Sequence, residues 1–160
     1  MPASIRPRRS VLYMPGSNPR ALEKARGLAA DALILDLEDA VAPDAKETAR
    51  GQVVQALAAG GYGQRELLVR VNSLATPWGH ADLAAVAGSG ADAVLIPKVE
   101  SAEAVRQAEA VLVAAGAPES LALWCMMETP LSILGAADIA RATPRMAGFV
   151  MGTSDLAKDL

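Results

Sequence analysis

Two acidic residues, Glu128 and Asp155, each stand at the end of an apolar run, where a helix can begin. Glu128 precedes Thr129-Pro130, a pair suited to cap and start a helix, and Asp155 follows VMGTS. A single acid at such a junction usually caps a helix. Two acids at neighbouring strand ends of a barrel converge on one point, however, and Mg²⁺ needs only one or two protein carboxylates. This placement predicts a Mg²⁺ site at Glu128 and Asp155.

A basic residue, Arg70, lies inside the apolar run LLVRVNS, where its permanent charge needs a partner. Its planar guanidinium is suited to hold a substrate carboxylate through two parallel hydrogen bonds. An internal ion pair with Asp36 or Glu38 is the alternative, and both uses can coexist. Asp36, Glu38 and Asp39 are more acids than one helix start requires, so we expect some to hold metal-bound waters and others to pair with Lys98 or Arg70.

Three further residues could take part in chemistry, but the sequence favours a structural role for each. Lys98, in LIPKVES, could form a Schiff base with a carbonyl substrate if its pKa were lowered, but the nearby acids favour a charged ion pair instead. His80 is the sole histidine and falls in the polar loop TPWGHADL, where a surface or capping role is expected. Cys125 has no histidine nearby in sequence and is expected to be a small buried side chain.

The elements that must position these residues are short apolar runs, each typical of a buried strand. Between them lie Ala-rich segments with helical spacing, such as NPRALEKARGLAA and SAEAVRQAEAVLVAAG. This alternation with short loops predicts parallel strands joined by right-handed crossovers. The six predicted strands are SVLYMPG, DALILDLED, ELLVRVNS, DAVLIPKVES, LALWCMMET and MAGFVMGTSD.

Two α/β architectures fit this order of elements, a (β/α)8 TIM barrel and an open doubly wound sheet. No GxGxxG follows the first strand, and polar residues end nearly every strand, as they do at a barrel mouth. A complete TIM barrel takes about 250 residues, whereas this chain has 160. We therefore expect residues 1–160 to form one partial TIM-barrel catalytic domain, truncated after about six strands, in a fragment of a longer protein.

The composition disfavours several classes of protein. A net charge of −3 and 3% aromatic residues give no broad basic surface for nucleic acid. No apolar run approaches the roughly 20 residues that span a membrane, and no secretory signal opens the chain. One cysteine excludes an intramolecular disulfide, so a cytoplasmic location is expected.

Six motifs resemble, in the same order, those of the citrate lyase β-subunit-like proteins of the HpcH/HpaI aldolase superfamily. The likeness runs from Arg8 to Leu160. HpcH/HpaI aldolases proper place a histidine after the second strand, where this sequence has LEDAV, so it resembles the CoA-thioester lyases more closely. In those relatives a C-terminal lid covers the mouth, often of a neighbouring subunit, which implies a homo-oligomer, a trimer or hexamer. The motifs are RRSVLYMPGSNPRALEKA, LDLEDAV, RVNS, IPKVES, MMETP and GTSDLAKDL.

The resemblance also implies roles for particular residues. Glu128 and Asp155 match the acids that bind Mg²⁺, and Glu38 and Asp39 match acids that reach it through waters. Arg70 matches the arginine that binds the substrate carboxylate. A loop whose backbone amides receive the same carboxylate matches Gly152, Thr153, Ser154 and Asp155.

The activity implied is a Mg²⁺-dependent carbon–carbon lyase that cleaves or forms 3-hydroxy-acyl thioesters of the malyl-, citramalyl- or citryl-CoA type, with an acetyl thioester and a 2-oxo acid as products. Glu38, Asp39 or a lid residue would take the hydroxyl proton. Arg9, Arg20 or Lys24 could meet the CoA pyrophosphate, or a carrier protein's phosphopantetheine, by charge alone. The alternatives are a Mg²⁺-dependent aldolase acting on free 2-oxo acids, and a non-catalytic barrel subunit of a lyase complex.

Overall fold

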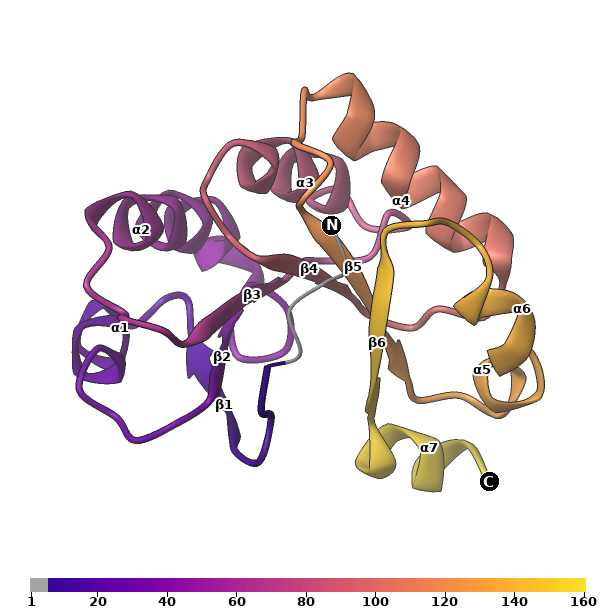
Figure 1. Ribbon diagram of the computed structural model, residues 1–160. Coiled ribbons are helices and arrows are strands. Elements are labelled where there is room, and N and C mark those ends of the chain that lie inside the picture. The colour runs from indigo at the N-terminus through magenta and orange to yellow at the C-terminus, as the bar shows by residue number, and fades with distance from the viewer. Residues whose placement is uncertain (1–5) are drawn as a thin grey trace.

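The computed structural model describes residues 6–160 and contains one sheet of six parallel strands in sequential order (Figure 1). Each strand pairs in parallel with its neighbour in the chain, as repeated right-handed β–α–β units require. This arrangement confirms the predicted α/β fold with the strand order of a TIM barrel. The strands are β1 (Val11–Pro15), β2 (Ala32–Asp36), β3 (Glu66–Arg70), β4 (Ala93–Ile96), β5 (Ala122–Met127) and β6 (Met146–Met151).

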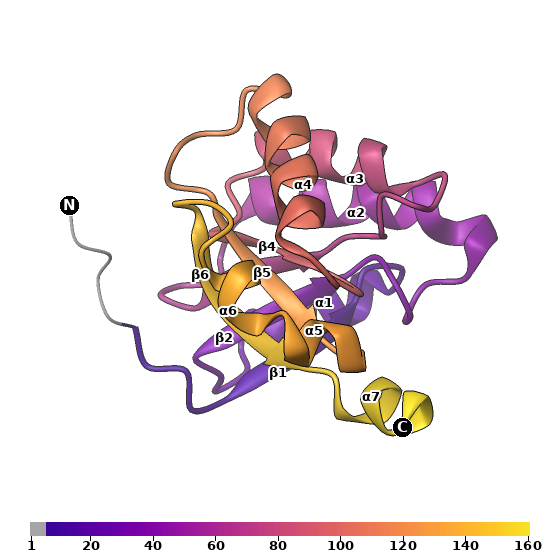
Figure 2. The same cartoon turned by 90° about the vertical axis from the view of Figure 1, so that its right-hand side faces the viewer.

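Helices follow each strand, and α1 to α6 surround the outer side of the curved sheet, whereas α7 lies beyond the end of β6 (Figures 1 and 2). Neighbouring helices pack against one another around the arc, from α1 against α2 to α4 against α6. No helix among residues 6–160 is long and apolar enough to cross a membrane. The helices are α1 (Pro19–Ala25), the 3₁₀ turn η1 (Pro43–Ala45), α2 (Lys46–Ala59), α3 (Gly79–Ala87), α4 (Ala102–Ala114), α5 (Pro130–Leu134), α6 (Ala136–Ala140) and α7 (Thr153–Asp159).

Local sequence signals explain where several helices begin. The Ser101 side chain accepts the amide of Ala104 and caps α4, as expected from its position. Thr129 and Ser132 form a reciprocal capping box at the start of α5, with Pro130 in the first turn. These caps fix the starts of α4 and α5 within a few residues of the ends of β4 and β5.

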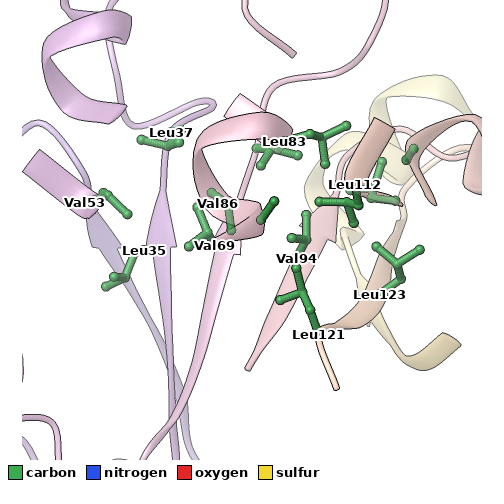
Figure 3. Close-up of a cluster of buried hydrophobic side chains, with 14 of the residues drawn as sticks. Leu35, Leu37, Val53, Val69, Leu83, Val86, Val94, Leu112, Leu121 and Leu123 are labelled. Carbon is green, nitrogen blue, oxygen red and sulfur yellow. The ribbon is translucent and has the colours of Figure 1, made fainter. Parts of the chain in front are cut away.

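The main core lies between the sheet and the helices (Figure 3). Alternate strand residues point outward to it, such as Leu35 on β2 and Val69 on β3, and meet helix residues such as Val53 and Val86. The other strand residues form a second cluster on the inner side of the arc, including Ile34. Strand β2 is therefore buried on both faces, which explains its unbroken apolar sequence.

Candidate active site

A cavity of about 440 Å³ lies at the carboxyl ends of the strands, where the predicted site residues meet. Parallel strands end on the same edge of a sheet, so residues far apart in the sequence converge there. The cavity is lined by Tyr13, Asp39, Arg70, Met126, Glu128, Met151, Gly152, Thr153, Ser154, Asp155 and Lys158.

Arg70 forms a buried, two-pronged ion pair with Asp36. Their strands are in register, so the two residues lie side by side at the ends of β3 and β2. Arg70 Nε and Nη2 donate to the Asp36 carboxylate at 2.7 and 2.6 Å. The structure thus contains the internal ion pair that the sequence offered as the alternative, and the edge of the guanidinium best suited to a substrate carboxylate is occupied. A guanidinium has five N–H donors, and Asp36 uses two of them. The second N–H of Arg70 Nη2 and both N–H groups of Nη1 remain for other partners.

Glu38 lies beside this pair with little access to water. Its Oε2 is 2.9 Å from Arg70 Nη1 but accepts no hydrogen bond. Burial raises the pKa of Glu38 to about 7; the positive charge of Arg70 opposes this shift, and the negative charges of Asp39 and Glu128 add to it. A carboxyl group that titrates near neutral pH is suited to accept a proton in catalysis. Asp39, by contrast, has a 61% exposed side chain and lies 3.6 Å from Arg70 Nη1.

The backbone that carries Glu38 is held by a buried lysine that sequence reasoning missed. Lys46 Nζ donates to the carbonyl oxygens of Leu37 (2.8 Å) and Glu38 (2.6 Å). Asn72 Nδ2 donates to the same Leu37 oxygen and to the fully buried Asp82. Burial lowers the pKa of Lys46. A lysine in the first turn of a helix opposes the helix dipole, and this mismatch was the only signal in the sequence.

Glu128 and Asp155 occupy the opposite side of the cavity. Glu128 is 2% exposed, and its Oε1 accepts the backbone amide of Lys98 at 2.7 Å. Burial raises the pKa of Glu128, the Lys98 amide lowers it, and the charge of Asp155 raises it again. The pKa of Asp155 is lowered mainly by Lys158, whose Nζ lies 3.0 Å from Asp155 Oδ1. The two carboxylates therefore influence each other across one cavity.

These two carboxylates form a donor set that fits Mg²⁺. Among residues 6–160, no three His, Cys, Asp or Glu side chains cluster closely enough to enclose a metal ion. Mg²⁺ does not require such a cluster, because it keeps several waters and binds through one or two carboxylates together with substrate oxygens. Glu128 is buried beside a second acid, and a cation is the natural compensation for that charge.

The loop from β6 into α7 presents fewer amides than the sequence suggested. The Gly152 amide donates to the carbonyl oxygen of Met127 at 3.0 Å, so it extends the sheet and does not face a substrate. Thr153, Ser154 and Asp155 belong to the first turn of α7, whose amides have no acceptor within the helix. The predicted carboxylate loop is thus reduced to these three amides.

The three basic residues considered for the CoA pyrophosphate do not lie together. Arg9 precedes β1 and therefore sits at the amino ends of the strands, away from the mouth, where it pairs with Asp31 at 2.9 Å. Residues before a parallel strand lie at the opposite edge from those after it, so the structure does not bring Arg9 to the mouth. Arg20 and Lys24 are exposed on α1, which follows β1 at the mouth edge.

His80 and Cys125 lie where the sequence predicts, whereas Lys98 does not. His80 is exposed in the first turn of α3, as expected. Cys125 is buried in β5, and burial raises its thiol pKa to about 12, which keeps it un-ionised. Lys98 differs from expectation, since its exposed side chain makes no ion pair with residues 6–160.

Tyr13 is a cavity residue that the sequence did not reveal. Its ring centre lies 4.9 Å from the Arg70 guanidinium carbon, a cation–π contact. Its hydroxyl lies 3.4 Å from Met126 Sδ, and its side chain is partly exposed to the cavity. A tyrosine in an apolar strand is read as a core residue, so only the barrel curvature places it at the site.

A profile of the HpcH/HpaI aldolase/citrate lyase family matches residues 9–160. The (3S)-malyl-CoA thioesterase of Cereibacter sphaeroides (strain ATCC 17025 / ATH 2.4.3) is 58% identical over 154 residues, covering 96% of this chain and 52% of that protein. The citrate lyase subunit beta of Escherichia coli (strain K12) is 41% identical over 160 residues, covering 97% and 53%. The chain thus spans about half the length of the curated relatives it matches.

Solved structures resemble the chain as well. One is the crystal structure of the protein CitE from Mycobacterium tuberculosis in complex with magnesium, acetoacetate and coenzyme A. It is 31% identical, with a TM-score of 0.76, and the match covers 97% of this chain and 52% of that one.

Proposed function

Because the chain belongs to the HpcH/HpaI aldolase/citrate lyase family, we propose that it forms the mouth of a Mg²⁺-dependent enzyme that acts on the CoA thioester of a hydroxy-dicarboxylic acid of the malyl type. The substrate class is supported by the 58% identity to a malyl-CoA thioesterase and by the CitE structure with magnesium and coenzyme A. The observation that carries the proposal is the cavity itself. It is lined by the Arg70 guanidinium and by the carboxylates of Glu128 and Asp155, and Glu38, whose carboxyl pKa is about 7, lies beside Arg70.

The geometry favours cleavage of the carbon–carbon bond beside the substrate hydroxyl. The remaining Arg70 donors would bind the free carboxylate, which lies next to the hydroxyl carbon in malyl-CoA. That position brings the hydroxyl close to Glu38, whose Oε2 lies 2.9 Å from Arg70 Nη1. Mg²⁺ at Glu128 and Asp155 would supply positive charge for the developing oxyanion.

The proposed step balances without water or an oxidant. Glu38 accepts the hydroxyl proton, the oxygen forms a carbonyl, and the bond between the hydroxyl carbon and the CH₂ next to the thioester breaks. The released electron pair forms the enolate of the acetyl thioester, which takes up a proton to give acetyl-CoA. Glyoxylate is the other product. Tyr13, stacked on Arg70, would hold the guanidinium in the plane in which it receives the carboxylate.

Hydrolysis of the thioester is the second candidate, because the relative with 58% identity is a thioesterase. In this case Glu38 would activate a water molecule that attacks the thioester carbonyl, and the products would be malate and free CoA. Both reactions need the carboxylate site and the acid near pH 7. They differ in which oxygen loses a proton to Glu38 and in which bond breaks: the carbon–carbon bond in the lyase reaction, the carbon–sulfur bond in hydrolysis.

A product assay with (3S)-malyl-CoA, with and without Mg²⁺, separates these possibilities. Equal amounts of acetyl-CoA and glyoxylate would support the lyase, whereas malate with free thiol would support hydrolysis. EDTA should abolish either reaction, and Arg70→Lys should lose nearly as much activity as Arg70→Ala, because an ammonium cannot reproduce the planar fork. Condensation of free pyruvate with aldehydes, without turnover of any CoA thioester, would replace the proposal with the free-acid aldolase. No turnover of either substrate class would favour the non-catalytic subunit.

A further inference from the structure

Lys98 has a backbone conformation that L-amino acids rarely adopt. Its φ is 51°, and among residues 6–160 it is the only residue other than glycine with a positive φ. This conformation is unfavourable for a residue with a side chain, because Cβ then approaches the following carbonyl oxygen. Such strain persists where the surrounding structure needs it, and Lys98 lies at the mouth, two residues after the end of β4.

The left-handed turn directs the Lys98 amide at Glu128. The amide nitrogen is 2.7 Å from Glu128 Oε1, a short hydrogen bond to a carboxylate that is 2% exposed. The Lys98 side chain is exposed and forms no ion pair within the part of the chain that the structure describes, and its charge lowers the pKa of Glu128 less than its amide does. The feature of Lys98 that matters at the site is therefore its peptide N–H.

Gly152 closes the other side of Glu128. A Cβ atom at position 152 would lie 2.5 Å from Glu128 Cβ and 2.8 Å from its Oε2, closer than real Cβ contacts come. Glu128 Oε1 is consequently held by the Lys98 amide, and Oε2 occupies space that is open only because residue 152 has no side chain. One oxygen, Oε2, is left facing the loop that carries Asp155.

We infer that Lys98 is a positioning residue whose left-handed backbone aims Glu128 at the metal, so that Glu128 binds through Oε2 alone. The inference rests on the Mg²⁺ assignment made in the proposed function. It replaces both side-chain roles considered for Lys98, Schiff-base formation and an ion pair, with a role of the main chain. Groups that orient a metal ligand typically account for about 10- to 100-fold in metal affinity.

The test compares two substitutions that remove the same charge. Lys98→Asn keeps the amide and tolerates a positive φ, whereas Lys98→Val keeps the amide but is branched at Cβ and strongly disfavours that φ. Mg²⁺ affinity is measured by isothermal titration, with Mn²⁺ as a second probe that accepts the same oxygen ligands. We expect Lys98→Asn to bind within about twofold of the wild-type protein and Lys98→Val to bind at least about tenfold more weakly.

Equal losses of Mg²⁺ affinity in both variants would overturn the inference, because the charge of Lys98 would then be the cause. Full Mg²⁺ affinity in Lys98→Val would also overturn it. Glu128→Gln separates this failure from that of the metal assignment: if it leaves Mg²⁺ affinity unchanged, the assignment itself is wrong. Should Lys98→Val fold poorly, the wild-type Lys98 amide provides a second readout by NMR. Its proton resonance should shift upfield in Glu128→Gln, and an unchanged resonance would contradict the hydrogen bond.

Discussion

Replacing Asp36 by asparagine tests whether the buried Asp36–Arg70 pair organises the mouth. The Asp36 carboxylate accepts both prongs of Arg70 at 2.7 and 2.6 Å, and the amides of Glu38 and Ala40 at 2.9 and 3.1 Å. In each orientation of an asparagine, one oxygen becomes an N–H donor. One Arg70 donor and one backbone amide would then lose their acceptor, and Arg70 would lose its principal countercharge.

The size of the effect follows from the burial of both partners. Asp36 is 1% exposed and Arg70 is 8% exposed, and removal of one partner from a buried pair costs about 3–5 kcal/mol. Glu38, 2.9 Å from Arg70 Nη1, remains as a partial countercharge, so we expect about 3 kcal/mol. This is a large share of the roughly 5–15 kcal/mol by which a domain is stable.

Urea unfolding near neutral pH, followed by circular dichroism, measures this free energy. With an m value of about 1–3 kcal/mol/M, the midpoint should fall by roughly 1–3 M. The matched control is Glu103→Gln, which removes the same charge from an exposed pair with Arg106 and should cost less than about 1 kcal/mol. A midpoint for Asp36→Asn no lower than that of the control, with an unchanged m value, would refute the reasoning.

Two further outcomes are expected. Burial raises the pKa of Glu38 from 4.5 to about 7, so the folded state binds this proton more tightly than the unfolded chain. That contribution to stability is complete below about pH 4.5 and is lost as the pH rises through about 7. Between these pH values, in EDTA, the urea midpoint of Glu38→Gln should therefore fall less than that of the wild-type protein. Parallel midpoint curves for the two proteins would contradict the raised pKa. Gly152→Ala should displace Glu128 and weaken Mg²⁺ binding about tenfold, measured by isothermal titration. The control is Gly51→Ala in helix α2, where the added Cβ would meet no atom within 4 Å. This control should raise the free energy of unfolding by about 0.5–1 kcal/mol.

The sequence by itself determined the order of elements and the edge at which the site forms. Alternating apolar runs and Ala-rich segments predict parallel strands, and polar residues that end such strands must gather at one edge. This is why the sequence predicts one site for Arg70, Glu128 and Asp155, and all three line the same cavity. The same rule, applied to Arg9, would have excluded it, since Arg9 precedes its strand.

Only the tertiary structure decided which groups at that edge bind one another. The sequence offered Asp36 or Glu38 as a partner for Arg70, and the register between β2 and β3 gives Asp36 the two-pronged pair because it sets these residues side by side. The positive φ of Lys98 and the close approach of Gly152 to Glu128 likewise come from long-range packing. Periodicity specifies strand and helix through local backbone preferences and burial, but register and individual dihedral angles are fixed when the elements pack together.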